Sequence, residues 1–187
     1  PGPVAQDFYN DDTSRFAFHM GPVGGGKTST CIMKRLRMAS LMPPDADGWR
    51  RDLMVVVRDT YRSAAKSTLV SWQEWFPKTF PGSNWTGGDD RPVTHVIRGR
   101  LQDGTKFEAT TEVVGLNGNR IEAVMRGKNF SSAWMNETAD LSRDAWLQVR
   151  RGGIGPEAHD QRRLQPRIGR GGRVVGRRQC QRTGAEI

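Results

Sequence analysis

Residues 21–28 read Gly-Pro-Val-Gly-Gly-Gly-Lys-Thr, which matches the phosphate-binding loop pattern G-x-x-x-x-G-K-[ST]. This pattern constrains the fold because such a loop connects a buried strand to the start of a helix. Glycines lack a Cβ, so their N–H groups can turn toward an anion that the helix dipole also favours. The segment therefore predicts a site for a nucleoside triphosphate with Mg²⁺. Its predicted residues are Gly21, Pro22, Val23, Gly24, Gly25, Gly26, Lys27, Thr28 and Ser29.

The segments on both sides of the loop agree with this prediction. Residues 15–20 are apolar and aromatic, as a buried strand should be, and we expect His19 to pack beside that strand. After the loop, apolar residues recur at helical spacing as far as Pro43-Pro44; they are Ile32, Leu36 and Ala39. Within the loop, Lys27 would reach the β/γ-phosphate oxygens and the Thr28 hydroxyl would bind Mg²⁺. The alternative is a flexible glycine-rich turn, which these flanks disfavour.

The rest of the chain alternates strand and helix patterns. Residues 53–57 are a continuous run rich in β-branched residues, which predicts a strand buried on both faces of a parallel sheet. A helix capped by Thr60 is predicted next, with Ala65, Leu69, Trp72, Trp75 and Phe76 in the core. A polar loop around Trp85 follows, then a hairpin (94–100 and 106–113), short helical turns (119–125), a strand (130–135) and a helix (141–149). This order predicts an α/β domain of three layers with a mainly parallel central sheet plus a β-hairpin.

The net charge of +9 is unevenly distributed along the 187 residues. Residues 156–187 hold eight Arg and three acidic residues, a balance of +5, which leaves +4 for residues 1–155. The tail has no aromatic residue and few apolar ones, so it cannot bury enough surface to fold. We therefore expect a partial ATPase-type domain at 1–155 and a disordered or frameshifted tail at 156–187. The chain has no membrane-length apolar stretch and no signal-peptide pattern, and the distant Cys31 and Cys180 fit a reducing cytosol.

A second candidate site follows the predicted strand at 130–135. Hydrolysis of a nucleotide needs a carboxylate that positions the attacking water, and sheet enzymes place ligands at strand ends. Glu137 is the candidate for that catalytic carboxylate. Asn136 takes the place of a magnesium-linked acid and would act through a water. A second interpretation is that Glu137 is only a helix N-terminal acid favoured by the dipole. A catalytic acid on a second strand would make this a P-loop NTPase of the ASCE type.

Taken together, these motifs resemble the N-terminal ATPase of tailed-phage terminase large subunits. The residues that carry the resemblance are 21–28, 56–62 with 71–72, 125–127, and 133–137, in the order of that family. The resemblance covers roughly residues 10 to 155 and implies an ATP-driven motor that packages double-stranded viral DNA into a procapsid. It further implies Mg²⁺, a terminase small subunit, a portal and procapsid, self-association in a ring, no membrane, and action in the host cytoplasm.

Three arginines have candidate roles. Arg126 resembles the arginine that these motors insert into a neighbouring subunit's site, where it would stabilise charge on the transferred phosphate. A solvated surface cation is the alternative, and Arg120 is the second candidate for the inserted arginine. Arg58 ends the predicted strand at 53–57 and either points toward the phosphates or pairs with Asp59 or Asp140.

The chain also departs from that family. It lacks the coupling motif of the next core strand, the acids of the C-terminal nuclease, and the apolar strand expected after Gly155. A reading-frame shift near 155–156 would explain the Arg-rich tail. When residues 157–182 are back-translated with permissive codons, the neighbouring reading frame can encode a sequence that resembles the continuation of the family. The domain is thus expected to be incomplete at its C-terminus. Three other functions stay open: an inactive prophage-derived fragment, another P-loop ATPase acting on nucleic acid, and a nucleic-acid-binding module that uses the basic tail.

Overall fold

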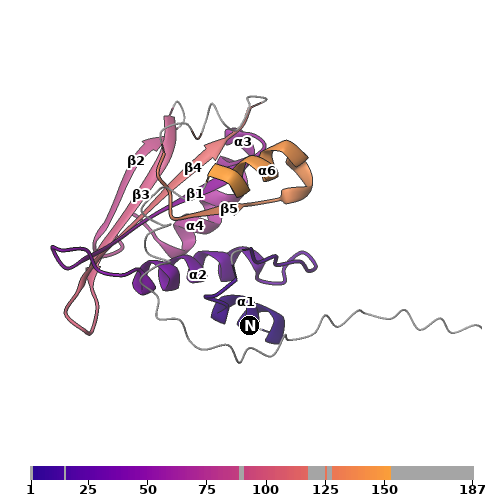
Figure 1. Cartoon of the computed structure of the whole chain (residues 1–187). Coiled ribbons are helices and arrows are strands. Elements are labelled where there is room, and N and C mark those ends of the chain that lie inside the picture. Colours follow the sequence, from indigo (N-terminus) through magenta and orange to yellow (C-terminus); the bar gives the residue numbers. More distant parts are fainter. Residues whose placement is uncertain (1, 15, 89–90, 118–124, 126–127, 153–187) are drawn as a thin grey trace, which may run out of the picture.

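The computed structural model describes residues 2–14, 16–88, 91–117, 125 and 128–152 (Figure 1). In chain order, its elements are α1 (Pro3–Asn10), α2 (Lys27–Leu41), β1 (Trp49–Arg58), α3 (Tyr61–Ser63), the π-helical turn η1 (Ala64–Thr68), α4 (Leu69–Trp75), β2 (Ser83–Gly88), β3 (Arg91–Arg100), β4 (Lys106–Gly115), β5 (Ser132–Met135), the 3₁₀ turn η2 (Thr138–Asp140) and α6 (Arg143–Gly152). The fold is mixed α/β, as predicted.

The strands form one five-stranded sheet in the order β2-β3-β4-β1-β5. β1 lies between two parallel neighbours, with Val57 opposite Val114 of β4 and Met135 of β5. Only β3 runs the other way, because it is antiparallel to both β2 and β4. The predicted strand at 53–57, the mainly parallel sheet and the β3–β4 hairpin are confirmed. The hairpin loop contains Gly104, whose φ of 83° suits glycine.

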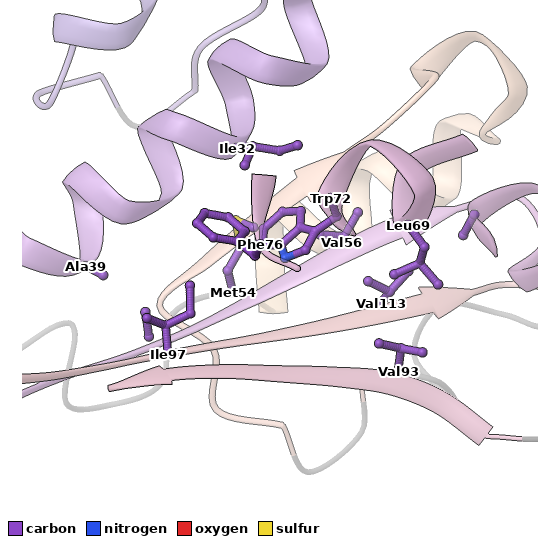
Figure 2. Close-up of a cluster of buried hydrophobic side chains, with 12 residues drawn as sticks. Ile32, Ala39, Met54, Val56, Leu69, Trp72, Phe76, Val93, Ile97 and Val113 are labelled. Carbon is purple, nitrogen blue, oxygen red and sulfur yellow. The ribbon is translucent and has the colours of Figure 1, made fainter. Parts of the chain in front are cut away.

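One apolar core lies between the sheet and the helices α2 and α4 (Figure 2). The labelled side chains of this core are Ile32, Ala39, Met54, Val56, Leu69, Trp72, Phe76, Val93, Ile97 and Val113. In Figure 2 the rings of Trp72 and Phe76 lie between α2 and the strands. The apolar stripes predicted for the first two long helices are therefore buried, and they attach both helices to the same face of the sheet.

A second core occupies the opposite face of the sheet. Successive residues of a strand point to opposite faces, and Val55 and Val57 belong to this core while Met54 and Val56 belong to the first. Its helix is α6, which contributes the buried Ala145. The helix predicted at 141–149 is found as α6, and β1 is buried on both faces, as its run of β-branched residues predicts.

The predicted strand at 15–20 is wrong. Residues 16–20 are irregular, and the side chains of Phe18 and Met20 are 65% and 84% exposed. A strand needs a neighbour to pair its backbone N–H and C=O groups. Among the described residues, β5 pairs with β1 alone, so its outer side is an open edge of the sheet, but residues 16–20 pair with no strand there. His19 stacks instead on Phe8 of α1, with ring centroids 4.9 Å apart.

Two predictions in the middle of the chain are also wrong. The polar segment around Trp85 is the strand β2, because it pairs with β3 and the Trp85 ring stacks on His95 at 4.1 Å. Trp75 was expected in the core but is exposed at the end of α4. Trp72 and Phe76 are four residues apart and share the buried face, whereas Trp75 lies about 100° around the helix from Phe76.

Helix α1 had no counterpart among the predicted elements. Lys34 of α2 donates to the carbonyls of Phe8 and Asp11, which holds the end of α1 against α2. Arg37 adds an ion pair with Asp12 at 2.8 Å. Of the predicted turns at 119–125 only Met125 is described, and the predicted tail at 156–187 lies outside the described residues.

Candidate functional site

The direction of α2 follows from two contacts with β1. Arg35, in the second half of α2, forms an ion pair with Asp52. Just after α2, the Met42 carbonyl accepts a hydrogen bond from Arg50 Nη1 at 2.5 Å. The later residue on the helix side, Met42, contacts the earlier residue of β1, Arg50. The two elements therefore run antiparallel. The start of α2, with the loop at 21–26, points toward the carboxyl end of β1 (Figure 1).

The Arg35–Asp52 pair anchors α2 to the sheet. Its two side chains are 1% and 2% exposed, and the guanidinium also donates to Thr111 Oγ1 at 3.2 Å and to the Thr110 carbonyl at 2.8 Å. A buried ion pair is tolerated when its donors are satisfied in this way. This pair was not among the residues predicted from the sequence. A signal was present, because Arg35 lies three residues after the buried Ile32, on the apolar side of α2.

Loop 21–26 has the backbone that its glycines permit. Gly24 and Gly26 have φ values of 78° and 74°, in the left-handed region where residues with a Cβ are strained. A Cβ at either position would meet no atom within 4 Å, so conformation rather than space requires glycine there. The N–H of Gly25 bonds to the Pro22 carbonyl at 3.2 Å, which curls the loop. All six loop residues are exposed.

The Lys27 ammonium lies inside this loop. Its Nζ donates to the carbonyls of Gly21 at 2.8 Å and Pro22 at 2.6 Å. Thr28 and Ser29 follow in the first turn of α2, partly buried. A bound phosphate chain would take Lys27 from these carbonyls, because a charged acceptor forms the stronger hydrogen bond. The predicted binding residues thus occupy one continuous, solvent-accessible loop at the start of a helix.

Arg58 and Asn136 end neighbouring strands on one face of the sheet. Arg58 is the last residue of β1 and shares a face with Val56. Asn136 extends β5 by one residue, since its N–H bonds to the Val57 carbonyl at 3.0 Å, and it shares a face with Trp134. Val56 and Trp134 both contribute to the core beneath α2. Arg58 and Asn136 therefore lie on the α2 side, at the edge toward which the loop points.

Glu137 marks the point where the chain leaves β5. Its backbone is left-handed, with φ 54° and ψ 61°, which is unusual for a residue with a Cβ. Strain of this kind, of the order of 1–3 kcal/mol, is concentrated at functional sites. The side chain is 62% exposed. It makes no capping hydrogen bond and precedes only a three-residue 3₁₀ turn, which does not favour the interpretation of Glu137 as a helix N-terminal acid stabilised by the dipole.

Arg58 connects this acid to β1. Its Nη1 is 4.0 Å from Oε1 of Glu137, and its Nε is 3.7 Å from Oδ1 of Asp59. The Arg58 side chain is 10% exposed, and its Nε and the Asp59 Oδ1 are buried without a hydrogen-bond partner in the described residues. The predicted pairing with Asp59 is confirmed, and the second acid is Glu137 rather than Asp140. Donors of this buried guanidinium remain available to an anion.

The donor set of this edge fits magnesium bound with a nucleotide. Mg²⁺ in such sites takes one or two protein oxygens and completes its octahedron with phosphate oxygens and waters. The Thr28 hydroxyl and the Asn136 amide oxygen are donors of that kind. The described residues contain no group of three His, Cys, Asp or Glu side chains that could hold a metal by themselves. A metal here would therefore depend on the phosphates.

The other candidate residues stay predictions. Arg126 and Arg120 lie outside the described residues, so their positions relative to the loop are untested. None of the helices in the described ranges is long and apolar enough to cross a bilayer.

Comparison with solved structures finds a likeness to the ATPase domain of the large terminase of Thermus phage P74-26, with a TM-score of 0.49 and 15% sequence identity. The match covers 82% of this chain and 62% of that chain, so this chain spans about three fifths of the length of that structure. No protein-family model matches the sequence, and no curated protein matches it.

Proposed function

We propose that this chain binds ATP with Mg²⁺ and hydrolyses it at the carboxyl edge of its sheet. The observation that carries the proposal is the direction of α2, which points the loop at 21–28 toward the edge where Arg58, Asn136 and Glu137 lie. A phosphate cradle and an exposed carboxylate at one edge are the parts that phosphoanhydride hydrolysis requires.

Each residue has a defined role in this proposal. The loop N–H groups and Lys27 hold the phosphates, and Lys27 exchanges its two loop carbonyls for phosphate oxygens. The Thr28 hydroxyl would hold Mg²⁺ and Asn136 would contribute through a water, and the metal would neutralise charge on the phosphates. Glu137 orients the attacking water and receives its proton. The water oxygen bonds to the γ-phosphorus while the bond to the bridging oxygen of ADP breaks.

The wider proposal rests on the resemblance of the sequence motifs to terminase large subunits. It makes the domain an ASCE-type, three-layer P-loop ATPase that drives double-stranded viral DNA into a procapsid in the host cytoplasm. Its partners would be a terminase small subunit, a portal and procapsid, and further copies in a ring, with Arg126 acting on a neighbour's nucleotide. The helices on both faces of the sheet support the three-layer assignment.

Two substitutions separate binding from hydrolysis. Lys27→Ala should weaken MgATP binding at least about tenfold, because a charged hydrogen bond to phosphate is lost. Glu137→Gln should bind MgATP like the parent but hydrolyse it at least about 100-fold more slowly. The exposed Lys78 and Glu74 provide the matched controls Lys78→Ala and Glu74→Gln, which should behave as the parent. Equal binding and hydrolysis by all five proteins would refute these roles.

If the chain is instead an inactive fragment, MgATP should not raise the melting temperature of the parent protein. A protein that binds the nucleotide only in its folded state is stabilised by that binding. The comparison of parent and Lys27→Ala melting curves, with and without MgATP, therefore separates the two functions.

A further inference from the structure

Asn117 follows the end of β4 in a backbone conformation that few residues adopt. Its φ is 49°, in the left-handed region, where asparagine is one of the few residues other than glycine that are found routinely. In the described ranges, Asn117 and Glu137 are the residues other than glycine with a positive φ, and each directly follows the carboxyl end of a strand of the sheet. Strain of this kind is concentrated at functional sites.

Asn117 holds both sides of the turn that follows β1. This turn is Asp59-Thr60, and it connects Arg58, the last residue of β1, to Tyr61, the first residue of α3. The Asn117 N–H donates to the Asp59 carbonyl at 2.8 Å. The Asn117 side chain accepts a hydrogen bond from the Tyr61 N–H, with 3.0 Å between the two heavy atoms. Because a backbone N–H can only donate, the amide must engage Tyr61 through its Oδ1.

The turn carries the acid that lies beside Arg58. The Arg58 guanidinium is 3.7 Å from Asp59 Oδ1 and 4.0 Å from Glu137 Oε1. Contacts of this length attract by charge but do not fix a direction as a hydrogen bond does. Arg58 Nε and Asp59 Oδ1 are both buried without a hydrogen-bond partner among the described residues. The place of Asp59, and through it that of Arg58, therefore depends on the backbone of the turn that Asn117 holds.

We propose that Asn117 is a positioning residue that keeps Arg58 directed at the transferred phosphate, and this inference rests on the proposed function. Without the Asn117 amide, the Tyr61 N–H loses this acceptor and the Asp59-Thr60 turn is free to move away from β4. The Arg58 guanidinium then loses its fixed place between Asp59 and Glu137. Stabilisation of a transition state requires charges that are held in place beforehand. The hydrolysis rate therefore depends on Asn117 more than nucleotide binding does.

The test is the effect of Asn117→Gly on kcat for ATP hydrolysis and on the dissociation constant of MgATP. Glycine adopts the left-handed backbone freely and keeps the N–H that bonds to Asp59, so this substitution removes only the amide. It should lower kcat about threefold and change the dissociation constant less than about twofold. Asn117 is exposed, so the variant should fold, which its melting curve checks. Asn84→Gly, at an exposed asparagine of β2, is the matched control.

An Arg58→Gln background distinguishes positioning from a general structural role. If Asn117 acts through Arg58, adding Asn117→Gly to Arg58→Gln should cause no further loss of kcat. An equal loss in both backgrounds would overturn the inference, and so would an unchanged kcat in Asn117→Gly or a loss confined to MgATP affinity. Absence of ATP hydrolysis by the parent is a different result, because it would overturn the proposed function as well.

Discussion

Arg58 Nη1 lies 4.0 Å from Oε1 of Glu137, so a nearly buried cation at the end of β1 faces an exposed acid at the end of β5. The contact is longer than a hydrogen bond, and Asp59 lies near the same guanidinium at 3.7 Å. A cation between two acids can hold Glu137 in place and also face the charge that develops on a transferred phosphate.

Replacing Arg58 should therefore affect hydrolysis more than binding. We expect Arg58→Gln to lower the hydrolysis rate at least about tenfold, because the charge beside Glu137 is lost. MgATP affinity should change less than in Lys27→Ala. Steady-state rates and dissociation constants for parent, Arg58→Gln and the exposed Arg62→Gln provide the comparison. A tenfold loss of affinity at an unchanged rate would place Arg58 in binding instead.

The buried ion pair gives a stability prediction. Asp52→Ala should lower the free energy of unfolding by about 3–5 kcal/mol, because it leaves the Arg35 guanidinium charged and unpaired in the core. The double variant Arg35→Met/Asp52→Leu should lose much less, since it removes both charges. Urea unfolding of the three proteins measures this. A double variant as unstable as the single one would show that the hydrogen bonds, rather than the unpaired charge, dominate.

A tight approach at Gly115 gives a second stability prediction. A Cβ on Gly115 would lie 1.8 Å from the Tyr61 backbone N and 2.4 Å from the Thr60 carbonyl carbon, so α3 would have to move away from β4. Gly115→Ala should cost more than about 2 kcal/mol of unfolding free energy. Gly104→Ala is the control: its φ of 83° is strained for alanine but its Cβ meets no atom, so about 1 kcal/mol is expected.

His95 predicts how stability depends on pH. Burial, aided by the charge of Arg35, lowers the pKa of His95 from 6.5 to about 4. Its Nδ1 accepts a hydrogen bond from Trp72 Nε1 at 2.9 Å, which requires the neutral ring. The unfolded chain protonates His95 more readily than the folded chain does. The contribution of His95 to the free energy of unfolding is therefore fully present above about pH 6.5 and is lost as the pH falls toward 4.

His95 alone should lower the free energy of unfolding by up to about 3 kcal/mol over this pH range. It is measured by urea unfolding at several pH values between 4 and 7, with His95→Gln as the non-titrating comparison. The parent should lose more stability than His95→Gln over this range. Parallel curves for the two proteins would contradict the assignment.

The elements predicted correctly are those encoded by local patterns. The helical spacing after the loop, the β-branched run of β1 and the turn at Asp103-Gly104 each determine structure within a few residues. The segment at 15–20 has an equally strong local pattern, but a strand also needs a neighbour, and no local pattern supplies one. β2 is the converse case, because its polar sequence looks like a loop until pairing with β3 and the stack of Trp85 on His95 are known.

The candidate site likewise combines a part that the local sequence predicts with contacts that it does not. The loop around Lys27 is one contiguous motif, so the sequence alone predicts it. The contact of Arg58 with Glu137 depends on the parallel register of β1 and β5, which sets Val57 opposite Met135. Register arises from the packing of the whole sheet. The pairing of Arg58 with Glu137 could therefore not be identified from sequence neighbours, whereas the place of Arg35 on the apolar side of α2 was a signal in the sequence itself.

The proposed nucleotide site is best tested by a crystal structure of the chain with Mg²⁺ and a non-hydrolysable ATP analogue. In that structure, Lys27 Nζ should leave the Gly21 and Pro22 carbonyls for the phosphates, and one water should bridge the γ-phosphate and Glu137. A nucleotide bound elsewhere, or a γ-phosphate on the opposite side of the molecule from Glu137, would contradict it.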